Sequence, residues 1–258
     1  MTPTTEKSST DKFWDERAKA EADDAKVNIA DTVQRDLELQ FVFPNINPTM
    51  RMIEVGCGNG FVTAQLRNRV AQVDSFDFAE NMIDRARKTH GETNNRFFSD
   101  SVLAPKNVGT EYDAALCIRV LINLRDTEEQ KVAVRSMAKM LRKGGRLILI
   151  EGYRDGFDAI NEARKAIGLA PANPAAINHY CYLAELMPTI LECFEIEQTW
   201  HSGMFDFLTR IVYPQLVGAD KAMEPGAFHK TIEPIVRANA LPDLAHYSRL
   251  RGFALLRK

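Results

Sequence analysis

The stretch that decides the fold is Ile53-Glu54-Val55-Gly56-Cys57-Gly58-Asn59-Gly60, where β-branched residues lead into three glycines at alternate positions. β-Branched residues favour a strand, and glycines permit a tight turn in which a ligand can approach the backbone. Phe61–Leu66 then has the character of the first turns of a helix. A strand, a glycine loop and a helix in this order are typical of the opening of a nucleotide-binding βαβ unit.

The spacing of the glycines indicates which nucleotide-like cofactor the loop binds. A dinucleotide fingerprint has glycines at its first, third and sixth positions, but counting from Gly56 the sixth position is Phe61, which argues against an NAD-type oxidoreductase. The stretch instead resembles the E-x-G-x-G-x-G signature of class I S-adenosylmethionine (SAM) methyltransferases, matched by Glu54, Gly56, Gly58 and Gly60. The resemblance covers about residues 50–152 and implies SAM as cofactor and S-adenosylhomocysteine (SAH) as product.

Strand and helix patterns alternate after the glycine loop. We expect strands at 50–55, 72–78, 96–99, 112–118 and 146–151, and helices at 61–68, 79–88 and 127–141. This rhythm predicts a parallel sheet with right-handed crossovers. The expected fold class is α/β: a Rossmann-like parallel sheet with an antiparallel last strand, helices on both faces and helical lid insertions.

Three segments follow from this pattern. Residues 1–48 are expected to form an N-terminal helical cap, which either folds over the cofactor, as the resemblance implies, or pads the sheet edge. Residues 49–152 are expected to form the SAM-binding Rossmann-like core that the resemblance implies. Residues 153–258 complete the sheet with strands near 194–201 and 252–257, whose long connection is interpreted as a substrate lid, with a helical decoration or a dimer contact as the alternative.

Asp77 ends the second predicted strand, 21 positions after Gly56. In nucleotide-binding α/β folds a carboxylate at this place accepts hydrogen bonds from the ribose hydroxyls. The segment from Asp77 to Met82 resembles the family's D-x-S-x-x-M motif. The resemblance therefore implies that Phe78 and Met82 pack against adenine, although core positions are the ordinary reading of such residues.

Further cofactor contacts are implied at neighbouring strand ends. The resemblance places Asp100 at the adenine amine, with Ser101 and Val102 touching the ring; a turn cap is the alternative for Asp100. Glu54 is expected to accept hydrogen bonds from loop amides. Arg119, a charge at the carboxyl end of a buried strand, is expected to line the site, with a surface ion pair as the alternative.

Methyl transfer requires donor and acceptor to be held in line in a dry pocket. If the acceptor is a hydroxyl, a general base helps, and the candidates are His179, Tyr153 and His246. No metal is expected, because Cys57, Cys117, Cys181 and Cys193 form no CxxC pair; the first two are expected to be buried thiols. The arginines that are available to hold an anionic group are Arg119, Arg125, Arg210, Arg249 and Arg251.

Composition limits the classes of partner that the chain is expected to bind. The 258 residues carry a formal net charge of −2, and the chain has no basic–aromatic stripe and no apolar run of the length of a membrane span. We therefore expect a cytoplasmic monomer or homodimer that transfers a methyl group to O or N of a small polar metabolite, such as a sugar or a phosphate-bearing compound, without nucleic acid or membrane as partner. The alternatives are a methyltransferase acting on RNA or protein and a non-enzymatic, methyltransferase-like binding module.

Overall fold

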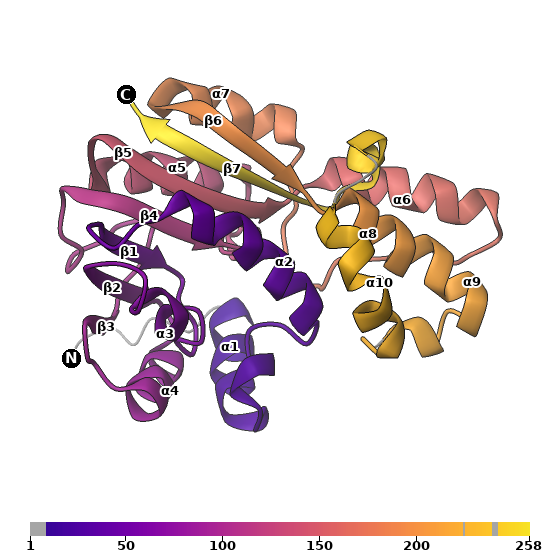
Figure 1. Ribbon diagram of the computed structural model, residues 1–258, viewed down its shortest axis with the longest axis horizontal. Coiled ribbons are helices and arrows are strands. Elements are labelled where there is room, and N and C mark those ends of the chain that lie inside the picture. Colours follow the sequence, from indigo (N-terminus) through magenta and orange to yellow (C-terminus); the bar gives the residue numbers. More distant parts are fainter. Residues whose placement is uncertain (1–8, 224, 239–241) are drawn as a thin grey trace.

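A single seven-stranded sheet organises the computed structural model, which describes residues 9–223, 225–238 and 242–258 (Figure 1). The strand order is β3-β2-β1-β4-β5-β7-β6. The strands are β1 (Arg51–Val55), β2 (Gln72–Asp77), β3 (Asn95–Ser99), β4 (Tyr112–Ile118), β5 (Leu141–Gly152), β6 (Phe194–His201) and β7 (Leu250–Arg257). Strands β1 to β5 pair in parallel, whereas β7 is antiparallel to both β5 and β6, which confirms the predicted fold class.

Helices cover both faces of this sheet (Figure 1). The α-helices are α1 (Ser9–Ala20), α2 (Thr32–Val42), α3 (Thr63–Leu66), α4 (Glu80–His90), α5 (Thr127–Met140), α6 (Arg154–Ala166), α7 (Leu183–Cys193), α8 (Gly203–Phe207), α9 (Tyr213–Val217) and α10 (Ala227–Ala238). None of the helices within the described ranges has the length and apolar character needed to cross a bilayer.

The alternation of side chains along β1 explains how the two layers form. Ile53 and Val55 point into a core cluster with α5 and α7, while Met52 points into a second cluster with α2 and α3. Strand β4 contributes to both clusters, so it needs the nearly continuous apolar run that its sequence has. The thiols of Cys57 and Cys117 are free and buried, as expected.

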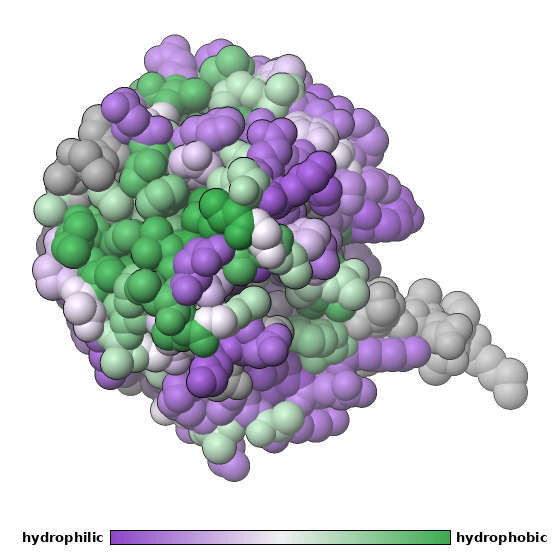
Figure 2. All heavy atoms as spheres, turned by 90° about the vertical axis from the view of Figure 1, so that its right-hand side faces the viewer, coloured by the Kyte–Doolittle hydropathy of each residue, from purple (hydrophilic) through white to green (hydrophobic). Residues whose placement is uncertain are grey.

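The connection between β6 and β7, residues 202–249, is called here the β6–β7 insertion. It contains α8, a π-helical turn (Leu208–Val212), α9 and α10, and it packs against the amino-terminal half of α2. There Val33 and Leu37 of α2 meet Phe205 of α8 and Ile232 of α10. Figure 2 turns the side of the molecule with α6, α9 and α10 toward the viewer, and hydrophobic side chains gather on it. Within the insertion, Leu216 is 67% exposed.

Two element ends differ from the predicted ranges. Helix α5 ends at Met140 rather than 141, and it begins after Asp126, whose carboxylate caps it by accepting the Glu129 amide at 2.9 Å. Strand β5 begins at Leu141 rather than 146, and its pairing with β4 shifts register between Tyr112 and Ala114. Both differences concern element ends and leave the sheet order unchanged.

Candidate active site

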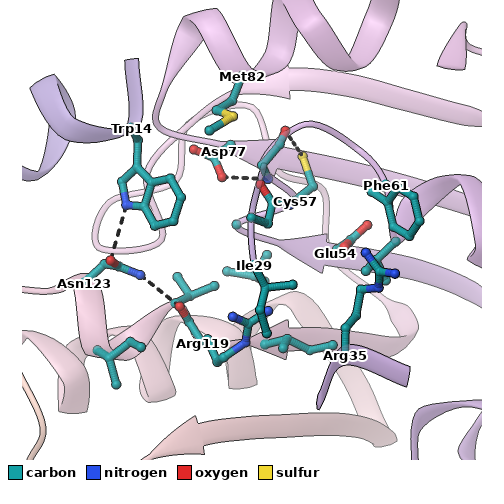
Figure 3. A pocket seen from close by; sticks show the side chains of 18 of the residues that line it. Trp14, Ile29, Arg35, Glu54, Cys57, Phe61, Asp77, Met82, Arg119 and Asn123 are labelled. Carbon is teal, nitrogen blue, oxygen red and sulfur yellow. Dashed lines mark hydrogen bonds between the residues drawn. The ribbon is translucent and has the colours of Figure 1, made fainter. Parts of the chain in front are cut away.

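A cavity of about 240 Å³ lies at the carboxyl ends of β1, β2 and β4 (Figure 3). The strand order changes direction between β1 and β4, and ligands of open α/β sheets bind in the crevice outside such a point. The rest of its wall comes from α1, residues 24–29, α2 and residues 175–178. The N-terminal segment therefore reaches over the strand ends that the sequence singled out.

The glycine loop forms one wall of the cavity. Gly56 and Gly58 line it, and their φ angles of +67° and +52° lie in the region that favours glycine. A Cβ at Gly58 would stand 2.3 Å from the side chain of Asn28, so the loop backbone is closely covered. Gly60 also has a positive φ angle, but it faces the core, where a Cβ would lie 2.8 Å from the ring of Phe97.

Asp77 ties the end of β2 to the glycine loop. Its Oδ2 accepts the Gly58 amide at 2.9 Å and its Oδ1 accepts the Ala79 amide at 2.9 Å, as Figure 3 shows for Gly58. Burial raises the pKa of Asp77 to about 6, against the opposing effect of these amides. Asp77 thus lines the cavity with a carboxylate whose remaining lone pairs are available to a ligand.

Three other predicted cofactor residues also line the cavity. Phe78 is 38% exposed and Met82 is buried beside it at the start of α4. Glu54 lies at the end of β1, where its carboxylate accepts the hydroxyls of Thr63 and Ser75, and burial raises the pKa of Glu54 to about 7. Glu54 was expected to accept loop amides; its partners are hydroxyl groups instead.

Asp100, Ser101 and Val102 are outside the set of described residues that line the cavity. The Asp100 carboxylate accepts the amides of Ser101, Lys106 and Asn107, which is the turn-cap arrangement. Val102 is buried in the core cluster that contains α5 and α7. Their role at adenine stays a prediction.

Arg119 follows β4 directly and lines the cavity, in a left-handed conformation with φ of +54°. Such a conformation is uncommon for a residue other than glycine. The carbonyl of Arg119 accepts the Asn123 side chain at 2.8 Å, and Asn123 in turn accepts the indole N–H of Trp14 at 3.2 Å (Figure 3). These bonds connect α1 to the turn after β4.

Three charged residues in the cavity wall were missed by the sequence analysis: Asp24, and Arg35 and Glu38 on α2. Glu38 is fully buried, with Oε1 3.1 Å from the Gln34 amide and 3.2 Å from Nε of Arg119. Its Oε2 has no hydrogen-bond partner among the described residues. One weak signal could have found Glu38: Gln34 and Glu38 are polar residues one turn apart on a helix whose Val33, Leu37 and Leu39 are apolar.

None of the three predicted bases is among the described residues that line the cavity. Tyr153 is fully buried, with its ring edge-on to Phe253 in the core. Nε2 of His179 is 3.2 Å from the hydroxyl of Thr127, and the His246 ring packs against Tyr247. Their catalytic role is therefore unsupported by the geometry.

Of the five arginines considered for an anionic group, only Arg119 lines the cavity. Arg125 pairs with Asp126 and Glu129 at the surface. Arg249 is held by Asp206 at 2.8 Å. The remaining two, Arg210 and Arg251, lie outside the cavity lining.

Comparisons with known proteins agree with this architecture. Residues 52–145 match the family model described as a methyltransferase domain. The ubiquinone biosynthesis O-methyltransferase of Xanthomonas axonopodis pv. citri is 26% identical over 157 residues, which cover 59% of this chain and 58% of that protein. The corresponding Xanthomonas oryzae pv. oryzae protein is 28% identical over 143 residues, 54% of this chain and 52% of its own. The chain thus spans about half the length of the curated relatives it matches.

Solved structures share the fold over nearly the whole chain. The N-methyltransferase NodS from Bradyrhizobium japonicum, in complex with SAH, aligns with a TM-score of 0.60 at 14% identity, covering 97% of this chain and 99% of that one. The magnesium protoporphyrin IX methyltransferase from Synechocystis, with bound SAH, gives 0.57 at 18% identity and covers 97% and 95%. This chain therefore carries a methyltransferase domain with the class I, Rossmann-like fold, as the resemblance of its glycine loop implied.

Proposed function

We propose that this chain is a SAM-dependent methyltransferase that transfers a methyl group to O or N of a small molecule. The observation that carries the proposal is the cavity at the β1–β4 switch point, walled by the glycine-loop backbone on one side and by Asp77 on the other. Bare backbone and an adjacent carboxylate are what a nucleoside with a free ribose diol requires.

The described residues fit that cofactor. Asp77 would hold the ribose hydroxyls through its remaining lone pairs, and Phe78 and Met82 would flank adenine. Gly56 and Gly58 would offer bare backbone to the amino-acid end, since a side chain at either position would be strained and would collide with Val120 or Asn28. The bound sulfonium supplies an electrophilic methyl group; the chain's own part is to orient both reactants and exclude water.

The acceptor is proposed to be a small molecule because curated relatives carry the name ubiquinone biosynthesis O-methyltransferase. A sugar or phosphate-bearing acceptor would find Arg35 and Arg119 in the cavity wall, although Arg119 is already paired with Glu38. An acceptor other than nucleic acid, a monomeric or homodimeric state and a cytoplasmic location stay predictions from composition.

Titration calorimetry with SAM and SAH tests the cofactor assignment, and saturable binding of both is expected. A folded protein that binds neither would refute it. Transfer is then measured with isotope-labelled SAM against a panel of phenols, amines, sugars and sugar phosphates. Incorporation into RNA or protein fractions, with none into the panel, would favour the macromolecular alternative.

A further inference from the structure

Methylation of a hydroxyl group requires that its proton be removed, and the cavity holds few groups that can accept one. Glu38 on α2 is the buried carboxylate that lies beside Arg119 in the cavity wall. We propose that Glu38 is the general base of methyl transfer and that the acceptor is a hydroxyl, of a phenol or an alcohol, hydrogen-bonded to its Oε2. This inference rests on the proposed function.

The hydrogen bonding of Glu38 supports a ligand at Oε2. Its Oε1 accepts a hydrogen bond from the Gln34 side-chain amide at 3.1 Å and forms an ion pair with Arg119, whose Nε lies 3.2 Å away without a hydrogen bond, whereas Oε2 has no partner within the described part of the chain. Buried side-chain oxygens are normally hydrogen-bonded, so an open position on a carboxylate in a cavity wall indicates a donor that arrives with the ligand. A hydroxyl is such a donor.

The position of Glu38 is fixed from several elements. Its helix packs on the sheet through Leu39 and Val42 and on the β6–β7 insertion through Val33 and Leu37. Because both ends of α2 are anchored, the carboxylate is held rather than mobile, as a base requires.

The surroundings of Glu38 also suit proton transfer. The charged and polar groups that face it are Arg119 from the end of β4, Arg249 from the segment before β7, and Asp31, Gln34 and Arg35 from α2 and its cap. Burial raises the pKa of Glu38, while Arg119, Gln34 and Arg249 oppose that rise. A carboxyl whose pKa is moved toward neutrality is a stronger base than an exposed one, and the facing arginines favour its ionised form.

The proposed step balances in atoms and charge. The oxygen–methyl bond forms as the sulfur–methyl bond breaks, and the hydroxyl proton passes to Oε2 of Glu38. The positive charge of the sulfonium and the negative charge of the carboxylate disappear together, which leaves a methyl ether, a thioether and a neutral Glu38. The proton then returns to water when the products leave.

The test compares Glu38→Gln and Glu38→Asp with the wild-type protein, and uses Glu128→Gln as control, because the Glu128 side chain on α5 is 79% exposed and pairs with Lys131, away from the cavity lining. With 4-nitrocatechol as acceptor, Glu38→Gln should lower kcat by about 10²- to 10⁴-fold. SAH affinity, from calorimetry, should change by less than about tenfold, since no cofactor bond is removed. Glu38→Asp should recover part of kcat, and Glu128→Gln should match the wild type.

Two further readouts separate a base from a structural residue. The acid limb of the kcat/KM profile should be absent in Glu38→Gln, and it should move to higher pH in Gln34→Leu, which removes a donor from the carboxylate. The absorbance of bound 4-nitrocatechol, in the presence of SAH, should shift toward the ionised phenol in the wild type and not in Glu38→Gln.

Several results would overturn the inference. They are a Glu38→Gln variant with wild-type kcat and pH profile, an acid limb that Gln34→Leu does not move, and a wild-type protein that binds SAH yet neither binds nor methylates any hydroxyl compound. The second and third of these results do not depend on Glu38→Gln, so either would overturn the inference even if that variant fails to fold. A wild-type protein that does not bind SAM or SAH would instead refute the proposed function itself.

Discussion

Replacement of Asp77 by alanine is the perturbation that probes the cofactor site most directly. Its two oxygens accept the Gly58 and Ala79 amides, each at 2.9 Å, and keep lone pairs for two ribose hydroxyls. The substitution therefore removes the ligand bonds together with the bonds that hold the glycine loop to β2. Binding and folding effects must be measured separately.

The magnitude of the binding effect follows from the charge of the acceptor. A hydrogen bond to an ionised group contributes about 1.5–3 kcal/mol, so losing the carboxylate should weaken SAH binding by about that amount, roughly 10- to 150-fold in Kd. Two loop amides left without acceptors would each cost about 1–3 kcal/mol of stability.

A pH effect acts against this loss of stability. Burial raises the pKa of Asp77 in the folded protein to about 6, above the value of 3.8 for an unperturbed side chain. A raised folded-state pKa means that the protonated form stabilises the fold. This contribution is complete below about pH 4 and is lost as the pH rises through about 6. At pH 8 alanine removes a carboxylate that is already unfavourable to burial, so the net loss of stability should be smaller than the two amides alone predict.

Calorimetry with SAH at pH 8, paired with urea unfolding, separates the two effects. Asp84→Ala on α4 is the matched control, because its side chain is 67% exposed and its pairing with Arg87 spans 3.7 Å. Asp77→Asn keeps one acceptor oxygen for a loop amide and should lose affinity with less loss of stability. Wild-type SAH affinity in a folded Asp77→Ala protein would refute the ribose assignment.

Four other outcomes follow from the structure. SAH affinity should be constant above about pH 7 and fall by up to about tenfold per pH unit below about 6, as the Asp77 carboxylate gains a proton; calorimetry on Asp77→Asn should give a flatter profile. Glu151→Leu leaves the three amides after Arg119 without an acceptor and should cost about 2–5 kcal/mol in urea unfolding, whereas Glu151→Gln should cost less. Gly58→Ala would place a Cβ 2.3 Å from the side chain of Asn28, at a residue with φ of +52°. It should therefore weaken SAH binding and lower stability by about 1–2 kcal/mol, and wild-type affinity and stability would contradict the loop geometry. The Arg85 guanidinium binds the carbonyls of residues 18 and 21 and the Asp24 carboxylate, and so ties α4 to the N-terminal segment that walls the cavity. Arg85→Met should loosen that wall and give faster SAH release in stopped-flow measurements; an unchanged rate would mean that this contact does not retain the cofactor.

The parts of the fold that were predictable depend on local sequence. The apolar run of β4 and the glycines after β1 fix a buried strand and a turn without reference to distant residues. The predicted bounds of β4 and β6 match the structure. The helix predicted after the glycine loop is shorter than expected, since α3 spans only Thr63–Leu66.

The predicted bases lie outside the cavity lining for a physical reason. Tyr153 follows β5 at the level of the other site residues, but its side chain turns into the core against Phe253 and is fully buried. Strand position alone does not say which way the next side chain points. Asp100 likewise lies at a strand end, yet it satisfies the amides of its own turn.

The difference between the two halves of the cavity lies in the sequence separation of their contacts. On the cofactor side, Asp77 binds the amide of Gly58 across 19 positions, within one βαβ unit that a motif can describe. On the side of Glu38, the chain of contacts runs from Arg119 through Glu38 and Gln34 to Arg249, and the last of these bonds spans 215 positions. Only the completed sheet brings the segment before β7 next to α2, so no local sequence motif predicts this half of the cavity. Because the Gln34–Glu38 segment also rests on the β6–β7 insertion, changes in the insertion can alter the side of the cavity that holds Glu38 while the wall formed by Asp77 and the glycine loop stays the same.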